Sequence, residues 1–419
     1  MSILILAALA LVTLLGAPLF SVIGTSAMLG FHREGVNLSV VAIEFFGLSE
    51  TPVLVAIPLF TFAGFLLSAG QAPRRLVRLT QALLGWLPGG LAIICLTTCA
   101  LFTAFTGASG VTIIALGALL FPALAEAGYD ERFNLGLITA SGSLGLLFAP
   151  SLPLILYGVV AEAPIDQLFV AGVLPGVLMI VLLSAYSVWR NRHVPRTRVA
   201  GSIREAWGAI RDARWDLPLP FVVLGGIYSG YFAVSEAAAV TALYVTLVEV
   251  VILREIAWRD LPRLMRESMV LVGAILVILG VSLASTNYMI DAGVPQQLFA
   301  LVSQYVTGPN TFLAVLLVFL LILGAILDIF SATVLIVPLL LPVASQYHIN
   351  PIHLGITFLA AMELGYLTPP VGLNLFIASH RFGKDITEIY WATQPFLLVS
   401  LLAVIIIAFW PGLSLMLLH

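Results

Sequence analysis

The chain has 419 residues, of which 61% are hydrophobic and only 9% are charged, and its formal net charge is −3. Its mean hydropathy is +1.12. The core of a soluble protein cannot absorb that much apolar surface, so the composition excludes a soluble fold and predicts an all-α polytopic membrane protein. We expect the arginines to set topology and to contact lipid headgroups, and we expect no nucleic-acid binding.

The first thirty residues are apolar, and no Lys or Arg precedes Arg33. A secretory signal would need a basic segment before a short apolar one, so this pattern predicts a retained membrane segment. Residues 3–30 are long enough for one span or for a pair of short ones, and the sequence leaves both open.

Basic residues are concentrated in a few connections. These are Arg74, Arg75 and Arg78; the seven arginines from Arg190 to Arg214; Arg254, Arg259, Arg263 and Arg266; and Arg381 with Lys384. The positive-inside rule places these connections in the cytoplasm, together with Arg132, and leaves only Arg33 of the eighteen basic residues outside. We therefore expect a multi-pass membrane protein with its C-terminus on the outer side.

This topology fixes the spans between the connections. The expected single spans are Thr51–Ala69, Leu168–Trp189, Met269–Ile290 and Ile389–Phe409. Because both of its ends are basic, Leu217–Leu253 must cross and return, with a turn near Tyr228–Gly230. The segment Ile256–Glu267, dotted with arginine, is predicted to be an amphipathic arm helix at the membrane surface.

Two apolar stretches, Leu91–Ala125 and Thr311–Ala344, begin and end on the same side in this topology. Each is predicted to be a re-entrant hairpin, which a membrane tolerates only where protein or a water-filled cavity surrounds the irregular backbone. The first contains FTGASG around Ser109, which also matches the G-x-S-G pattern of intramembrane serine proteases. A serine nucleophile needs a base within reach, and all six histidines fall in loops or at the ends of spans, which favours the hairpin.

The two halves of the chain match each other at a separation of 220 residues. Pro122 pairs with Pro342, Gly145 with Gly365, and Pro150 with Pro370. Matching segments have opposite predicted orientation, so we expect an inverted repeat with two broken helices, 135–160 and 353–378. Such paired interruptions mark the midplane site of a transporter, where free carbonyls bind cations and half-helix N-termini favour anions. The predicted division is 1–50 (scaffold of repeat 1 with an arm), 51–189 (repeat 1, with hairpin 91–125), 190–267 (cytoplasmic loop, scaffold hairpin and arm) and 268–419 (repeat 2, with hairpin 311–344).

Six stretches are similar to one known family. They are Ala56–Gly70, Leu87–Ala92, Pro150–Ala161, Ser235–Tyr244, Leu327–Val343 and, most specifically, MELGYLTPPVGLNLF at Met362–Phe376. With them the whole chain resembles the large permease subunit of tripartite ATP-independent periplasmic (TRAP) transporters, C4-dicarboxylate type. It departs from the family at Phe65, usually Asn, and at Ala149, usually Pro.

The resemblance implies a transporter and not an enzyme, located in the bacterial inner membrane with its C-terminus in the periplasm. It implies an elevator mechanism, a Na⁺ gradient as the driving force, and a carboxylate delivered by a soluble periplasmic binding protein. It also implies a small four-helix membrane subunit as a separate chain, with Na⁺ as the coupling ion and no organic cofactor. A stand-alone Na⁺-coupled carboxylate symporter of similar architecture remains the alternative.

The candidate site residues follow from the hairpin tips and the broken helices. For Na⁺ they are Thr106, Gly107, Ser109, Ser143, Gly145, Gly324, Asp328, Thr333, Gly365 and Thr368. For the substrate they are Pro150, Ser151, Glu363, Pro369, Gly372 and Asn374. Structural alternatives exist for each kind: glycines permit close helix packing, hydroxyls bond back to helix carbonyls, and Asp328 can cap the second half of its hairpin.

Overall fold

The fold is described from a computed structural model that covers residues 9, 11–12, 16–87, 89–193 and 203–418. In these residues the regular structure is helical throughout, as the sequence predicts. Within the described residues, seven helices are long and apolar enough to span a membrane, or eight if one bent pair is counted as a span. The prediction of an all-α polytopic membrane protein is confirmed.

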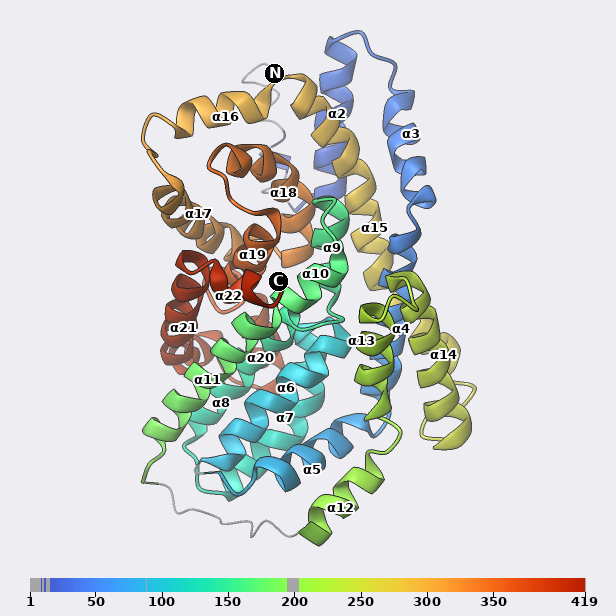
Figure 1. The fold of residues 1–419 in the computed structure, drawn as a ribbon, viewed down its shortest axis with the longest axis vertical. Helices are drawn as coiled ribbons and strands as arrows, with labels where there is room; N and C mark the ends of the chain where they lie inside the picture. The colour runs from blue at the N-terminus through green and yellow to red at the C-terminus, as the bar shows by residue number, and fades with distance from the viewer. Residues whose placement is uncertain (1–8, 10, 13–15, 88, 194–202, 419) are drawn as a thin grey trace.

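The first helices form one side of the bundle (Figure 1). They are α2 (Leu19–Arg33), α3 (Ser39–Gly47), the short turns η1 (Leu48–Glu50) and η2 (Pro52–Val55), and α4 (Ala56–Ala69). All three helices pack along α15 (Leu261–Asp291). The rings of Phe45 and Tyr288 lie against Gly280 and Gly30, where a β-carbon would approach within 2.1 and 2.5 Å. The first residues of the expected 3–30 segment lie outside the described part of the chain.

The rest of the first half contains a helical pair and an interrupted helix. Its elements are α5 (Ala72–Leu84), α6 (Gly90–Thr106), α7 (Ser109–Glu126), α8 (Glu131–Ser141), η3 (Leu144–Leu147), α9 (Leu152–Val160), α10 (Ile165–Ala171) and α11 (Val173–Arg190). The segment Glu131–Leu147 meets α9 at a bend of 44°. The predicted break in 135–160 is therefore present, and it consists of the four residues between Leu147 and the start of α9 at Leu152.

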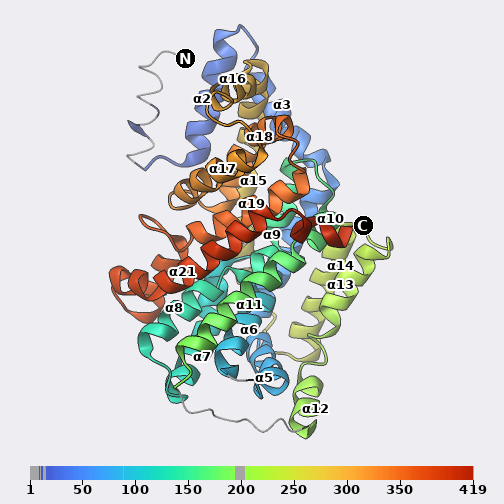
Figure 2. The same cartoon turned by 60° about the vertical axis from the view of Figure 1, so that its left-hand side comes forward.

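A separate pair of helices follows and lies beside the main bundle (Figure 2). After α12 (Ile203–Asp212), α13 (Pro218–Tyr228) and α14 (Val234–Thr246) form an antiparallel pair that continues into a π-helical turn, η4 (Leu247–Ile252). Its turn coincides with the predicted break near Tyr228–Gly230. Glu236 accepts a hydrogen bond from the backbone N–H of Ala233 at 2.9 Å and so stabilises the start of α14. Arg198, expected in the cytoplasm, lies outside the described residues.

The second half repeats the order of the first. Its elements are α15, α16 (Val294–Val302), α17 (Pro309–Gly324), α18 (Ile329–Gln346), α19 (Pro351–Gly365), α20 (Leu373–Phe382), α21 (Ile386–Phe409), α22 (Gly412–Leu415) and η5 (Met416–Leu418). The pair α17–α18 corresponds to α6–α7, and the interrupted pair α19–α20 to α8–α9. In Figure 1 the first pair lies in the lower half and the second in the upper half. Asp130 and Asn350, 220 residues apart, cap α8 and α19, and the Ala149–Pro150 and Pro369–Pro370 peptides are both cis.

The prediction of a separate arm helix at Ile256–Glu267 is wrong. The chain turns irregularly until Asp260, and Leu261 begins a single 31-residue helix, α15. Pro262 lies in the first turn of α15, where its missing N–H costs nothing, and neither glycine nor proline interrupts the next turns. The amphipathic first turns thus continue directly into the apolar span. In the described part of the chain, α5, α12 and α16 are amphipathic helices that stand apart from the spans.

A buried ion cluster fixes α5 against the α13–α14 pair. Arg75 contacts Asp216 through Nε at 2.5 Å, Glu249 through Nη2 at 2.9 Å, and Glu255 through Nη1. Burial by itself lowers the pKa of Arg75, but the hydrogen bond to Asp216 and the three carboxylates together raise it above its ordinary value. One guanidinium therefore serves three acids that lie between 141 and 180 residues away in sequence.

Candidate functional site

The break after α8 packs against α6, the first helix of the α6–α7 pair, and we call this contact the first junction. A β-carbon on Gly145 would lie 2.3 Å from the Ala100 carbonyl oxygen and 2.5 Å from the Ala104 nitrogen of α6. Gly107, between α6 and α7, has a φ of +64° and lies against the Leu152 side chain of α9. Both glycines are required by backbone contact or conformation, so the tip of the pair and the break form one closely packed unit.

The second junction repeats this arrangement with two glycines facing each other. A β-carbon on Gly365 would lie 2.5 Å from the Cα and carbonyl carbon of Gly324. The N–H of Val371, in the break between α19 and α20, donates to the Ala325 carbonyl at 3.1 Å. The end of α17 and the break after α19 therefore touch backbone to backbone.

The halves also cross over. Helix α7 of the first pair packs against α20, and α18 of the second pair packs against α9. Asn374, on α20, donates from Nδ2 to the Thr139 carbonyl of α8 at 3.3 Å. Ser143 and Glu363, equivalent positions in the two repeats, are neighbours, and Ser143 is the hydroxyl that faces the Glu363 carboxylate. The candidate residues of both halves therefore gather around one centre.

Asp328 is the N-cap of α18. Its Oδ1 accepts from the backbone N–H groups of Phe330 and Ser331 at 2.9 and 3.0 Å, and its Oδ2 accepts from the Ser331 hydroxyl at 2.6 Å. The structural alternative considered for this carboxylate is thus present. A carboxylate oxygen carries more than one lone pair, so the cap leaves acceptor capacity for a cation.

Three of the candidate hydroxyls bond back to carbonyls of their own segment. Thr333 donates to Ile329 at 2.6 Å, Thr368 to Leu364 at 2.9 Å, and Ser151 to Leu146 at 2.5 Å. Four candidate side chains are different because they hold buried atoms without a hydrogen-bond partner. These atoms are the Thr106 and Ser143 hydroxyls, Asn374 Oδ1 and both carboxylate oxygens of Glu363. Buried polar atoms are normally paired, so these four are the stronger candidates for binding an ion or substrate.

The two breaks differ in exposure. Pro150 and Ser151 are buried, whereas Pro369 is exposed and Thr368 half-buried. Gly372, the residue before α20, has a φ of +49° and is buried. The second break is therefore the one open to the surface in this conformation.

Sequence reasoning missed three buried threonines, Thr103, Thr112 and Thr357. The Thr103 hydroxyl lies 2.7 Å from the Thr112 hydroxyl and donates to the Gly142 carbonyl at 2.8 Å, which ties α6 to the end of α8. The Thr357 hydroxyl, inside α19, is buried without a partner. Threonines are common in apolar helices, so the sequence offered no signal that would separate these three from the others.

Ser109 is the first residue of α7 and is buried. The buried histidine of the described chain, His353, contacts the Ser414 hydroxyl at 3.3 Å and the Ala408 carbonyl at 3.1 Å. No hydrogen bond joins Ser109 to a histidine among the described residues, and the arrangement of a serine protease is not found there.

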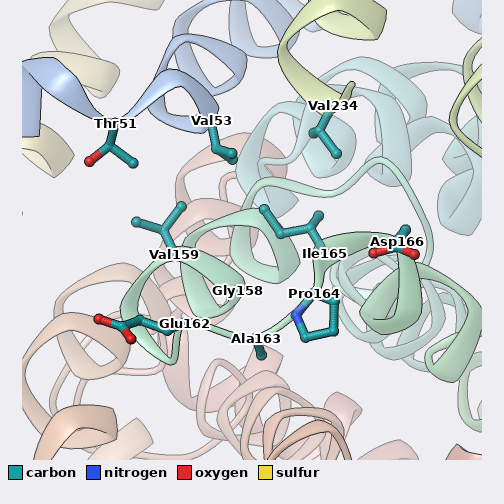
Figure 3. A pocket seen from close by; sticks show the side chains of 10 residues that line it. All are labelled: Thr51, Val53, Gly158, Val159, Glu162, Ala163, Pro164, Ile165, Asp166 and Val234. Carbon is teal, nitrogen blue, oxygen red and sulfur yellow. The ribbon is translucent and has the colours of Figure 1, made fainter. Parts of the chain in front are cut away.

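A cavity of about 360 Å³ lies away from this centre, between η2, the start of α14 and the turn that joins α9 to α10. Figure 3 shows Val159 and Ile165 within it and the carboxylates of Glu162 and Asp166 on opposite sides. None of the predicted site residues lines it. We regard it as a gap between the α13–α14 pair and the main bundle.

Interrupted helices in matched halves, each packed against a helical pair inside an apolar bundle, define a polytopic membrane transporter with an internal repeat. The chain matches the family described as "Tripartite ATP-independent periplasmic transporter, DctM component" over residues 3–413, and it belongs to this family.

Curated relatives agree over nearly the full length. The chain is 34% identical to the C4-dicarboxylate TRAP transporter large permease protein of Pseudomonas aeruginosa, covering 94% of this chain and 92% of that protein. It is 32% identical to the ectoine/5-hydroxyectoine large permease of Ruegeria pomeroyi, covering 87% and 85%. Its fold is similar to the YdaH transporter of Alcanivorax borkumensis, with a TM-score of 0.62 at 17% identity over 89% of this chain and 88% of that one.

Proposed function

We propose that this protein carries out Na⁺-coupled uptake of a small carboxylate that a soluble periplasmic binding protein delivers. The observation that supports this most is the pair of junctions where Gly145 meets α6 and Gly365 meets Gly324. Interrupted helices at such junctions leave carbonyl oxygens without helical partners, and these hard oxygens suit Na⁺. The chain would work in the bacterial inner membrane beside a small four-helix membrane subunit.

The carboxylate would bind where α9 and α20 begin. Each helix starts at a break, so its free N–H groups and positive dipole end favour an anion. Gly372 is the residue before the start of α20. The Oδ1 atom of Asn374 has no hydrogen-bond partner and could accept a hydrogen bond from a donor group of the substrate. The proposal names the class of small carboxylates, since relatives named for C4-dicarboxylate and for ectoine are almost equally similar to the chain.

An elevator movement fits the packing. The pairs α6–α7 and α17–α18 and the interrupted helices cross-pack into one unit, which would be the moving domain. Helices α5 and α16 precede the two pairs at equivalent places and would connect that domain to a scaffold of α2–α4 and α13–α15. We propose that both helical pairs are re-entrant hairpins in this arrangement.

The test is Asp328→Asn in reconstituted vesicles, with Asp130→Asn as the matched control. Both aspartates are helix N-caps, but only Asp328 lies at the centre. Asparagine still caps a helix and removes only the charge. We expect normal yield for both variants, and a loss of transport or a sharp fall in apparent Na⁺ affinity for Asp328→Asn alone. Unchanged Na⁺ dependence in that variant would reduce Asp328 to a cap.

A further inference from the structure

Helix α12 carries two arginines and a tryptophan along one side, which we call the α12 stripe. At 3.6 residues per turn, Arg204, Trp207 and Arg211 lie within about 60° of one another around the helix axis. All three side chains are exposed, and the exposed fraction of Trp207 is 70%. A tryptophan between basic residues is typical of a helix at a membrane surface, where the ring lies among the lipid headgroups.

The opposite side of α12 packs on α5. Ala209 and Ala213 are buried there in a small apolar cluster with Leu79 of α5. Asp212, at the end of α12, forms an ion pair with Arg78 of α5. The apolar side of α12 is therefore covered by protein, and the α12 stripe is the side left open to the surroundings.

The positive charges of the stripe are not balanced inside the protein. In the part of the chain that the structure describes, no carboxylate forms an ion pair with Arg204 or Arg211. Glu205 is exposed on another side of the helix. Arg214, two residues beyond the end of α12, lies over the Trp215 ring at 5.6 Å and adds a third cation without a carboxylate partner. This charge pattern is complementary to an anionic partner.

The position of α12 indicates that this partner is the membrane. Figures 1 and 2 both show α12 beside α5 at one end of the molecule. Exposed tryptophans also occur where the neighbouring elements end or begin: Trp86 follows α5, Trp189 is in the last turn of α11, and Trp258 precedes α15. Helices α11 and α15 belong to apolar spans, so these tryptophans mark the level of the headgroups.

We propose that the α12 stripe binds anionic phospholipid. The guanidinium groups of Arg204 and Arg211 would contact the headgroup phosphates, and the Trp207 ring would lie at the boundary between headgroups and acyl chains. Because α12 packs on α5, and α5 directly precedes α6, the bound lipid also holds the start of the first helical pair at the membrane surface. This site rests on the membrane location of the chain and not on the proposed transport.

Lipid binding is measured by thermal unfolding of the full-length protein in neutral detergent. Dioctanoyl phosphatidylglycerol should raise the unfolding midpoint more than dioctanoyl phosphatidylcholine, and inorganic phosphate alone should not raise it. The double variant Arg204→Gln, Arg211→Gln should bind phosphatidylglycerol about 25-fold more weakly, since it loses two arginines near an anionic surface. Arg259→Gln with Arg266→Gln is the matched control, because both arginines are exposed and lie outside α12.

Three results of this titration would overturn the proposal. Equal stabilisation by the two lipids would remove the preference for negative charge. Equal loss of affinity in the two double variants would indicate a general effect of net charge and no site on α12. Stabilisation by inorganic phosphate alone would indicate a site for a free anion and not for a lipid.

Fluorescence locates the bound lipid at Trp207. The protein is reconstituted in vesicles of phosphatidylcholine with a minor share of phosphatidylglycerol, one of the two lipids being brominated on its acyl chains. The difference in emission between the wild type and Trp207→Phe gives the signal of this one ring. Brominated phosphatidylglycerol should quench it more strongly than the same share of brominated phosphatidylcholine, and Arg204→Gln with Arg211→Gln should abolish the difference. No quenching of Trp207 by either lipid would show that the stripe faces water and would refute the site, whatever the result of the transport assays.

Discussion

Replacement of Gly365 by alanine would separate the two backbones that meet at the second junction. The new β-carbon would lie 2.5 Å from the Cα and carbonyl carbon of Gly324, whereas ordinary contacts begin at 3.4 Å. The neighbour is backbone and cannot rotate away, so α17 and α19 would have to move apart by about 0.9 Å. Overpacking of this kind costs about 1–3 kcal/mol.

Thermal unfolding of the purified protein measures this cost, which should lower the midpoint by several degrees. Na⁺-driven uptake should fall further than stability does, because the displaced backbone carries the proposed ion ligands. Gly273→Ala is the matched control, since its β-carbon would meet nothing within 4 Å inside α15, and alanine is favoured over glycine in a helix by about 1 kcal/mol. Wild-type stability and uptake in Gly365→Ala would refute the close junction.

Other substitutions test separate parts of the molecule. Arg75→Ala removes the one cation from between three acids and should lower the free energy of unfolding by about 3–5 kcal/mol. Glu249→Gln should lower it much less, and equal melting temperatures of the two variants would contradict the shared role of Arg75. Ser109→Ala should weaken Na⁺ affinity with the fold intact, and Gly107→Leu should do more damage because of its φ of +64°; covalent labelling of Ser109 by a fluorophosphonate would instead favour a protease. A cysteine at Arg263 should react only with reagents added from the cytoplasm, and labelling from the periplasm would reverse the topology.

The helices of the transport centre were predictable because their signals are local. Glycine and proline at matched positions indicate the breaks, and apolar runs bounded by basic loops indicate the helical pairs, so the predicted 91–125 and 311–344 lie within two residues of α6–α7 and α17–α18 at each end. The arm at Ile256–Glu267 was mispredicted because amphipathic turns can continue into a span without any residue that ends the helix.

The sequence could not predict which residues contact each other across the fold. The ion cluster joins Arg75 to acids more than a hundred residues away, and the missing partners of Glu363 are a property of the surrounding helices. Asp328 and Glu363 look alike as single acids in apolar stretches. Only the packed structure shows that the first caps a helix and the second has no partner.

The central claim is tested most directly by uptake into vesicles that contain this protein and its small membrane subunit. A labelled carboxylate is offered with and without an inward Na⁺ gradient, and with and without the soluble binding protein. We predict uptake only when both are present. Uptake driven by Na⁺ without the binding protein would identify a stand-alone symporter, and uptake with the binding protein but no Na⁺ gradient would contradict the coupling.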